Sequence, residues 1–194
     1  MRSMEFDCDR ARFVPSFAWE ELMADFDESL IDLEVPIEQR LKPFAGIVEH
    51  LRGVEYVLVG GAAAIAHGCP TVTRDYDIVP QQAEENLARL ARCLTEIGAY
   101  VREPRGSGRR PPATRELLGA VFANRGNLLL NSNEGPLDIL TQLHDGRRFE
   151  DIPAQVLGMV RVIEIGTLID LKRAIGRPRD LLVLPYLEEI RRRG

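Results

Sequence analysis

One segment constrains the fold more than any other: residues 56–80, YVLVGGAAAIAHGCPTVTRDYDIVP. An apolar, β-branched run at 54–59 predicts a buried strand, and a glycine pair at 60–61 ends it. A short helix of small residues is expected at 62–67, and 72–79 alternates as a second strand. The segment therefore predicts a strand–helix–strand unit with a tight turn at the glycine pair.

Two carboxylates, Asp75 and Asp77, lie on the second strand of this unit. Side chains at i and i+2 of a strand share a face, about 7 Å apart along the chain. Two carboxylates at that range repel unless a cation lies between them, and their hard oxygens suit Mg²⁺ or Mn²⁺. Gly60 and Gly61 would let backbone N–H groups meet a phosphate with no Cβ in the way. The parts together predict phosphoryl or nucleotidyl transfer.

The segment resembles the signature of the nucleotidyltransferase superfamily, a hydrophobic strand, a G-G pair and an acidic-apolar-acidic triplet. The longer form, GG-x-A-x-x-x-x-G-x-x-x-x-T-x-D-x-D, is matched at Gly60, Gly61, Ala63, Gly68, Thr73, Asp75 and Asp77. It is most similar to the small prokaryotic group that includes abortive-infection (type IV) toxin nucleotidyltransferases. The resemblance implies a nucleotidyltransferase fold of the α/β (α+β) class, with a mixed central sheet flanked by helices. Those toxins often carry an arginine where this chain has Thr71, and Arg74 is the substitute that would hold phosphates.

The superfamily uses a third carboxylate on a later strand, and the resemblance places it at Asp138. Asp138 is a lone acid in the apolar stretch Gly-Pro-Leu-Asp-Ile-Leu. An acid on an inner strand needs a partner to be tolerated, which favours the functional interpretation. The alternative is a strand residue that faces solvent, with Asp145 or Glu164 as the third carboxylate. In the first case Asp138 is a metal ligand and the base that takes the proton of the acceptor hydroxyl.

The stretch 168–181, LIDLKRAIGRPRDL, also resembles the toxin-like group. The resemblance implies that Lys172 contacts phosphate and that Asp180 orients the phosphate or a basic neighbour. A solvated helix lysine is the alternative. The segment 103–113, EPRGSGRRPPA, is a loop whose arginines either close over a triphosphate or grip RNA, or simply form a solvated connection.

The rest of the pattern completes a mixed α/β domain. Further helices are expected at 18–33, 36–51, 83–97, 167–175 and 178–192, the fourth opened by a capping box from Thr167 to Asp170. Further strands are expected at 100–102, 121–123, 128–130, 137–140 and 160–165. We divide the chain into an N-terminal helical extension, 1–50, and a nucleotidyltransferase domain, 51–194, with C-terminal helices at 168–193.

Composition narrows the class of protein. The net charge is −5, which gives no support to nonspecific nucleic-acid binding. No apolar run is long enough to span a membrane, and the start lacks a secretory signal, so we expect a cytoplasmic protein without a membrane partner. His67, Cys69 and Cys93 have no orienting third group, and we interpret them as packing residues rather than a thiol nucleophile.

These observations predict an enzyme that transfers a nucleoside monophosphate from an NTP to an acceptor hydroxyl, with Mg²⁺ or Mn²⁺ as cofactor. The toxin-like resemblance implies RNA as acceptor and a cognate antitoxin as partner. One alternative is a nucleotide-binding or partner protein without turnover. Another is an enzyme acting on a small, aminoglycoside-like acceptor, which calls for an acidic pocket built from Glu134 and Asp145.

Overall fold

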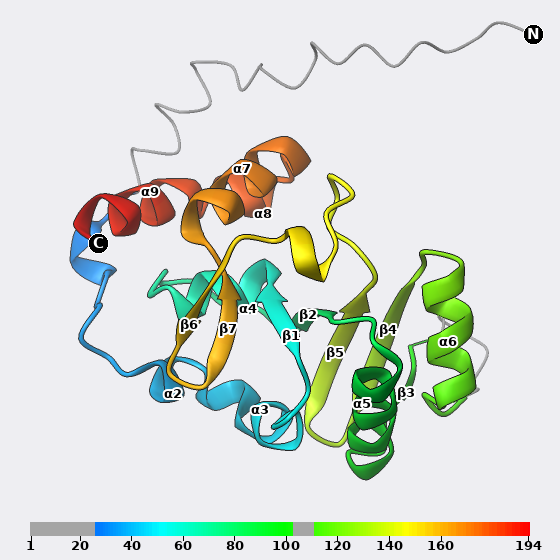
Figure 1. Cartoon of the computed structure of the whole chain (residues 1–194). Helices are drawn as coiled ribbons and strands as arrows, with labels where there is room; N and C mark the ends of the chain where they lie inside the picture. The colour runs from blue at the N-terminus through cyan, green and yellow to red at the C-terminus, as the bar shows by residue number, and fades with distance from the viewer. Residues whose placement is uncertain (1–25, 103–110) are drawn as a thin grey trace, which may run out of the picture.

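The computed structural model describes residues 26–102 and 111–194. The fold is built around a central sheet (Figure 1). Within these ranges the sheet has seven strands in the order β3-β4-β5-β2-β1-β7-β6. β1 pairs in parallel with β7, and β2 with β5, whereas the other neighbours are antiparallel. The strands are β1 (Tyr56–Val59), β2 (Tyr76–Pro80), β3 (Tyr100–Val101), β4 (Asn127–Ser132), β5 (Gly135–Leu140), β6 (Ala154–Leu157) and β7 (Val160–Ile163). The expected class, a mixed α/β fold with a central mixed sheet, is confirmed.

Helices flank this sheet. Figure 1 shows α7, α8 and α9 grouped at the top of the view, α2 and α3 at the bottom, and α5 and α6 beside β3, β4 and β5. The helices are α2 (Ile37–Arg40), α3 (Ala45–His50), α4 (Gly60–Ala66), α5 (Glu84–Glu96), α6 (Arg115–Ala123), α7 (Ile165–Ile175), α8 (Pro178–Leu181) and α9 (Leu184–Arg193). Among them α4 packs on β1, β2 and β7, at the middle of the sheet.

The core lies along the central strands. All four residues of β1 are buried, and so are Ile78 and Val79 of β2 and Ile139 of β5. Strands with apolar residues on both faces need a covering layer on each side, which the helices supply. Full burial of each such side chain stabilises the fold by about 1.5–3 kcal/mol. Asp77 and Asp138, described below, are thus held on the buried central strands.

The described part of the N-terminal extension adds to the same core. Leu41, Phe44 and Ile47 are buried against it. The single helix expected at 36–51 is wrong, because two short helices, α2 and α3, flank a 3₁₀ turn at Lys42–Phe44 that contains Pro43. Proline lacks the N–H that a continuous helix requires.

The helix expected at 18–33 falls partly outside the described residues. Between residues 26 and 33 the chain forms only a 3₁₀ turn, Glu28–Leu30, so the helical interpretation is wrong there. Asp27 explains the difference, because its carboxylate accepts hydrogen bonds from the backbone N–H and the hydroxyl of Ser29. An aspartate that bonds the backbone two residues on favours a turn over a helix.

Five other features of the structure differ from the expectations. Residues 121–123 end α6 and are not a strand, and β6 is a strand that the sequence pattern does not predict. The second strand of the motif begins at Tyr76, so Asp75 lies on the loop before it. α7 begins at Ile165, two residues before the expected capping box, and Glu164 precedes it. The last helix is two, α8 and α9, separated at Leu182 and Val183.

No helix within 26–102 or 111–194 is both long enough and apolar enough to cross a membrane.

Candidate active site

The turn from β1 into α4 seats the Asp77 carboxylate. Asp77 pairs with Val59, the last residue of β1, and Gly60 follows with a φ of +67°. A Cβ on Gly60 would lie 2.1 Å from Oδ2 of Asp77, and one on Gly61 would lie 2.6 Å from Oγ1 of Thr73. The backbone N–H of Gly61 donates a hydrogen bond to the Asp77 carboxylate. The glycine pair therefore makes room for β2 and its preceding loop, a role that the sequence pattern does not indicate.

Asp138 lies beside Asp77 on the neighbouring strand. β2 and β5 run parallel, and their register pairs Asp77 with Asp138. Paired residues of adjacent strands point to the same face, with the strands about 4.8 Å apart. Asp138 is buried, with 8% of its surface exposed, so the interpretation as a solvent-facing strand residue is wrong. Asp75, two residues before Asp77, completes a cluster of three carboxylates.

Burial and mutual repulsion both act on this cluster. Burial, followed by the charges of Asp138 and Asp75, raises the pKa of Asp77 to about 7, against the opposing effects of the Gly61 N–H and Arg177. Burial also raises the pKa of Asp138, while Arg102 acts to lower it and Asp75 to raise it further. Two of the three carboxylates thus lie in surroundings that disfavour their charged forms.

Arg102 supplies positive charge at the cluster. Its Nη2 lies 3.0 Å from Oδ1 of Asp138 and 3.4 Å from Oδ1 of Asp75, and it donates to the carbonyl of Leu130 at 3.0 Å. In the sequence Arg102 is only one of several arginines in or beside a loop. The position of Arg102 beside the carboxylates depends on the pairing of β3 with β4, and no local sequence motif predicts that pairing.

The donor set has the chemistry of a divalent-cation site but is not arranged as one. Within the described ranges no group of three or more His, Cys, Asp or Glu side chains stands ready to hold a metal ion. Arg102 is bonded to Asp75 and Asp138, two of the three carboxylates that would hold a cation. The carboxylates fit Mg²⁺ or Mn²⁺ as hard oxygen ligands, provided that Arg102 leaves them.

A second charged group lies between α7 and α8. Nζ of Lys172 donates to Oδ1 of Asp180 at 3.0 Å, and Nε of Arg177 donates to Oδ2 at 2.5 Å. Burial by itself would raise the pKa of Asp180, but the hydrogen bonds and charges of Arg177 and Lys172 together hold the pKa below its ordinary value. Lys172 is buried, so it is not a solvated helix lysine, whereas about half of the Arg177 side chain is exposed. Because the Arg177 charge acts on Asp77, this group is coupled to the carboxylate cluster.

The remaining candidates lie apart from the cluster, on the exposed loop next to it, or outside the described residues. Asp145 is bonded to Arg147 in an exposed turn, and Glu164 accepts from the Thr167 hydroxyl at the start of α7. Arg74 is exposed on the loop before Asp75. Arg105, Arg109 and Arg110 lie outside the part of the chain that the structure describes.

The acidic acceptor pocket expected from Glu134 and Asp145 is not formed. Glu134 lies in the turn before β5 and Asp145 in the turn after it. The six residues of β5 place these turns at opposite ends of the strand, roughly 20 Å apart at about 3.3 Å per residue. The thiol interpretation also finds no support, because burial raises the pKa of Cys69 to about 12 and lowers the pKa of His67.

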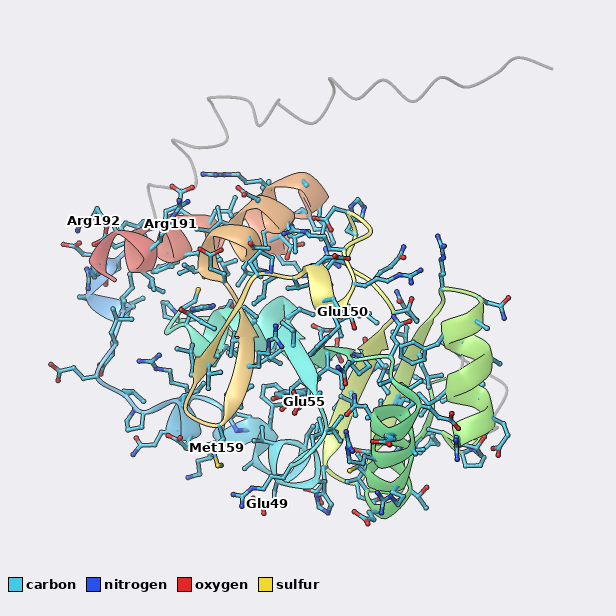
Figure 2. All side chains as sticks on the ribbon, in the orientation of Figure 1. Glu49, Glu55, Glu150, Met159, Arg191 and Arg192 are labelled. Atoms are coloured by element: carbon cyan, nitrogen blue, oxygen red, sulfur yellow. The ribbon has the colours of Figure 1, made fainter. Side chains whose placement is uncertain are left out.

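A hollow of about 570 Å³ lies away from these groups, between α3, the start of β1 and the β6–β7 hairpin. Glu55 and Met159, which line it, are labelled in Figure 2, as are Arg191 and Arg192 on α9. None of the three clustered carboxylates lines this hollow. The candidate site at the carboxylates is therefore separate from this hollow.

Comparisons with known proteins give only loose likenesses. No family model matches the chain, and no curated protein matches it. JHP933 from Helicobacter pylori has a solved structure with a TM-score of 0.44 and 16% identity, over 79% of this chain and 66% of JHP933, just under two thirds. The antibiotic-resistance factor ANT(2'')-Ia, a protein with substrate-regulated conformational dynamics, has a TM-score of 0.43 and 14% identity, over 79% of this chain and 92% of its own. TM-scores this low establish neither family nor activity.

Proposed function

We propose that this chain is a metal-dependent nucleotidyltransferase that moves a nucleoside monophosphate from an NTP to an acceptor hydroxyl. One observation carries the proposal: the register of β2 and β5 pairs Asp77 with Asp138, beside Asp75. Two of these three carboxylates are buried or nearly so. Such a cluster destabilises a protein if its role is only structural, because the charges repel, whereas it is favourable where a metal ion binds. The resemblance of the sequence motif supports the same activity.

Asp75, Asp77 and Asp138 would hold the divalent cation, Mg²⁺ or Mn²⁺. When bound, such a cation neutralises triphosphate charge and makes a coordinated hydroxyl more acidic. The protein's own contribution is to fix the carboxylates. Gly60 and Gly61 leave room for Asp77 and the loop before it, and the β2–β5 pairing places Asp138 beside Asp77.

The reaction needs a base and positive charge for the triphosphate. Asp138 would accept the proton of the acceptor hydroxyl. The hydroxyl oxygen would bond to the α-phosphorus, and the bond between the α-phosphorus and the α–β bridging oxygen would break, releasing pyrophosphate. A carboxylate with a raised pKa is suited to this role at neutral pH. Arg177, held by Asp180 and half exposed, would face the triphosphate, with Arg74 as a further contact. Lys172 would act on the phosphates through Asp180 or directly.

For the acceptor we propose RNA, in a toxin-like protein restrained by a cognate antitoxin. The support is the arginine-rich segment 103–113 and the resemblance of two motifs. Arginines are well suited to bidentate contacts with phosphates. The second candidate, a nucleotide-binding partner without turnover, is favoured by the contact of Arg102 with two of the carboxylates.

Incubation with each α-labelled NTP, Mg²⁺ or Mn²⁺, and total RNA tests the proposal. We expect one or more NTPs to label RNA, and the label to be lost with EDTA or with Asp77→Asn. Labelling of an added aminoglycoside in place of RNA would reassign the acceptor. Nucleotide binding without any labelled product would favour the partner protein.

A further inference from the structure

Arg102 has a fixed backbone and a side chain that can move. Its N–H donates to the carbonyl of Leu129 at 2.7 Å, which ties the end of β3 to β4. The Val101 N–H donates to the carbonyl of Pro111 at 2.9 Å on the other side. About a third of the Arg102 side chain is exposed. The guanidinium can therefore leave the carboxylates for solvent without any loss of sheet pairing.

Besides its hydrogen bond to the Leu130 carbonyl, this guanidinium contacts two of the carboxylates that would hold a metal ion. Nη2 lies within hydrogen-bond range of Oδ1 of both Asp75 and Asp138. A divalent cation held by Asp75 and Asp138 would lie close to this guanidinium. Two cations at such a distance repel strongly at a partly buried site. Arg102 and a divalent cation thus exclude each other from this position.

We propose, building on the proposed function, that Arg102 is a built-in counterion of the metal-free site, which the metal ion must displace. In the metal-free protein it neutralises Asp75 and Asp138 and lowers the free-energy cost of burying the Asp138 carboxylate. The same contact lowers the affinity for free divalent cations. A metal–nucleotide complex displaces Arg102 more readily than the metal alone, because its phosphates offer the freed guanidinium a new partner.

The first experiment measures Mn²⁺ binding, by electron paramagnetic resonance, to the wild-type chain, Arg102→Ala and Arg102→Gln. We expect both variants to bind Mn²⁺ about three- to tenfold more tightly, because a competing charge has been removed. Arg115→Ala is the matched control, since Arg115 is an exposed arginine paired with Glu84. It should bind Mn²⁺ as the wild type does. Unchanged or weaker binding in both Arg102 variants, or no Mn²⁺ binding at all, would overturn the proposal.

The second experiment measures the counterion role without metal. In EDTA, Arg102→Ala should lower the melting temperature in the wild-type background and have a clearly smaller effect in Asp138→Asn, where the buried charge is gone. If the effects of Arg102→Ala and Asp138→Asn on the melting temperature simply add, the counterion role is contradicted. The two proposals can fail separately. Tighter Mn²⁺ binding without any labelled product refutes the transferase and keeps the inference, whereas a labelled product with unchanged Mn²⁺ affinity does the reverse.

Discussion

Gly60 lies so close under Asp77 that a Cβ would come within 2.1 Å of the carboxylate oxygen Oδ2. Gly60 also has a positive φ, which L side chains rarely adopt. Gly60→Ala should therefore lower the free energy of unfolding by about 2–4 kcal/mol and displace Asp77. Chemical denaturation measures the loss.

Gly53→Ala is the matched control for this substitution. Gly53 has a φ of +80°, but a Cβ added there would meet no atom within 4 Å, so the variant reports the backbone strain alone. We expect a cost of about 1 kcal/mol there. Equal costs at the two glycines would mean that the contact with Asp77 is unimportant.

Asp77 should make the metal-free protein less stable as pH rises. Its pKa is about 7 in the folded chain against 3.8 as the ordinary value, so between these pH values the folded state binds more protons than the unfolded state. The free energy of unfolding then falls as pH rises from about 4 to about 7, by an amount on the order of 2–4 kcal/mol. Asp77→Asn removes this fall, and in EDTA at about pH 8, above the folded-state pKa, it should melt at a higher temperature than the wild type. Parallel pH profiles of the two proteins would refute the assignment.

Asp138→Asn should reduce nucleotidyl transfer by about 10²–10⁴-fold with nucleotide binding retained, since its role lies with proton transfer and the cation. Single-turnover kinetics and calorimetry separate the two effects. Asp145→Asn is the control, because Asp145 is bonded to Arg147 in an exposed turn. If Asp145→Asn abolishes transfer while Asp138→Asn does not, the base has been misassigned.

Lys172→Met should destabilise the fold by about 3 kcal/mol, because it leaves the buried Asp180 carboxylate with Arg177 alone. Lys42 is exposed, and Lys42→Met should change the free energy of unfolding by no more than about 0.5 kcal/mol. The folded Lys172→Met protein should also bind triphosphate more weakly, because Asp180, which holds Arg177, loses its second partner. Wild-type affinity in that variant would remove Lys172 and Asp180 from the nucleotide site.

The arginines of the segment 103–113 should govern binding of an RNA acceptor. Replacing Arg105, Arg109 and Arg110 with alanine should make the salt dependence of RNA binding shallower, by about one unit of slope per lost phosphate contact. Fluorescence anisotropy over a salt series measures the slope. An unchanged slope with RNA still labelled would show that other residues contact the RNA.

The strand–glycine–helix–strand unit is predictable because its signals are local. A buried β-branched strand, a glycine turn and a small-residue helix each have their own pattern, and β1, α4 and β2 follow in that order. The proximity of Asp75 to Asp77 follows from chain spacing alone. The pairing of Asp138 with Asp77 does not, and only the family resemblance points to it.

Where the sequence pattern misleads, nonlocal or very short signals are responsible. The apolar run 121–123 is three residues long, too short to separate strand from helix periodicity, and α6 continues through it. β6 escapes prediction because Gln155 and Val156 are both exposed, so no apolar alternation marks the strand. Arg102 acts on the carboxylates through the pairing of β3 with β4, which sequence spacing does not specify.

The register of the parallel pairing between β2 and β5 can change only in steps of a whole residue. A slip of one residue would bring Leu137 or Ile139 opposite Asp77 and turn Asp138 to the other face of the sheet. The separation of the two carboxylates is therefore independent of the length of the chain that connects the strands. Insertions in the loops between β2 and β5 can enlarge or reshape the surface beside the cluster while its spacing stays unchanged, so acceptor preference and reaction geometry are free to evolve separately.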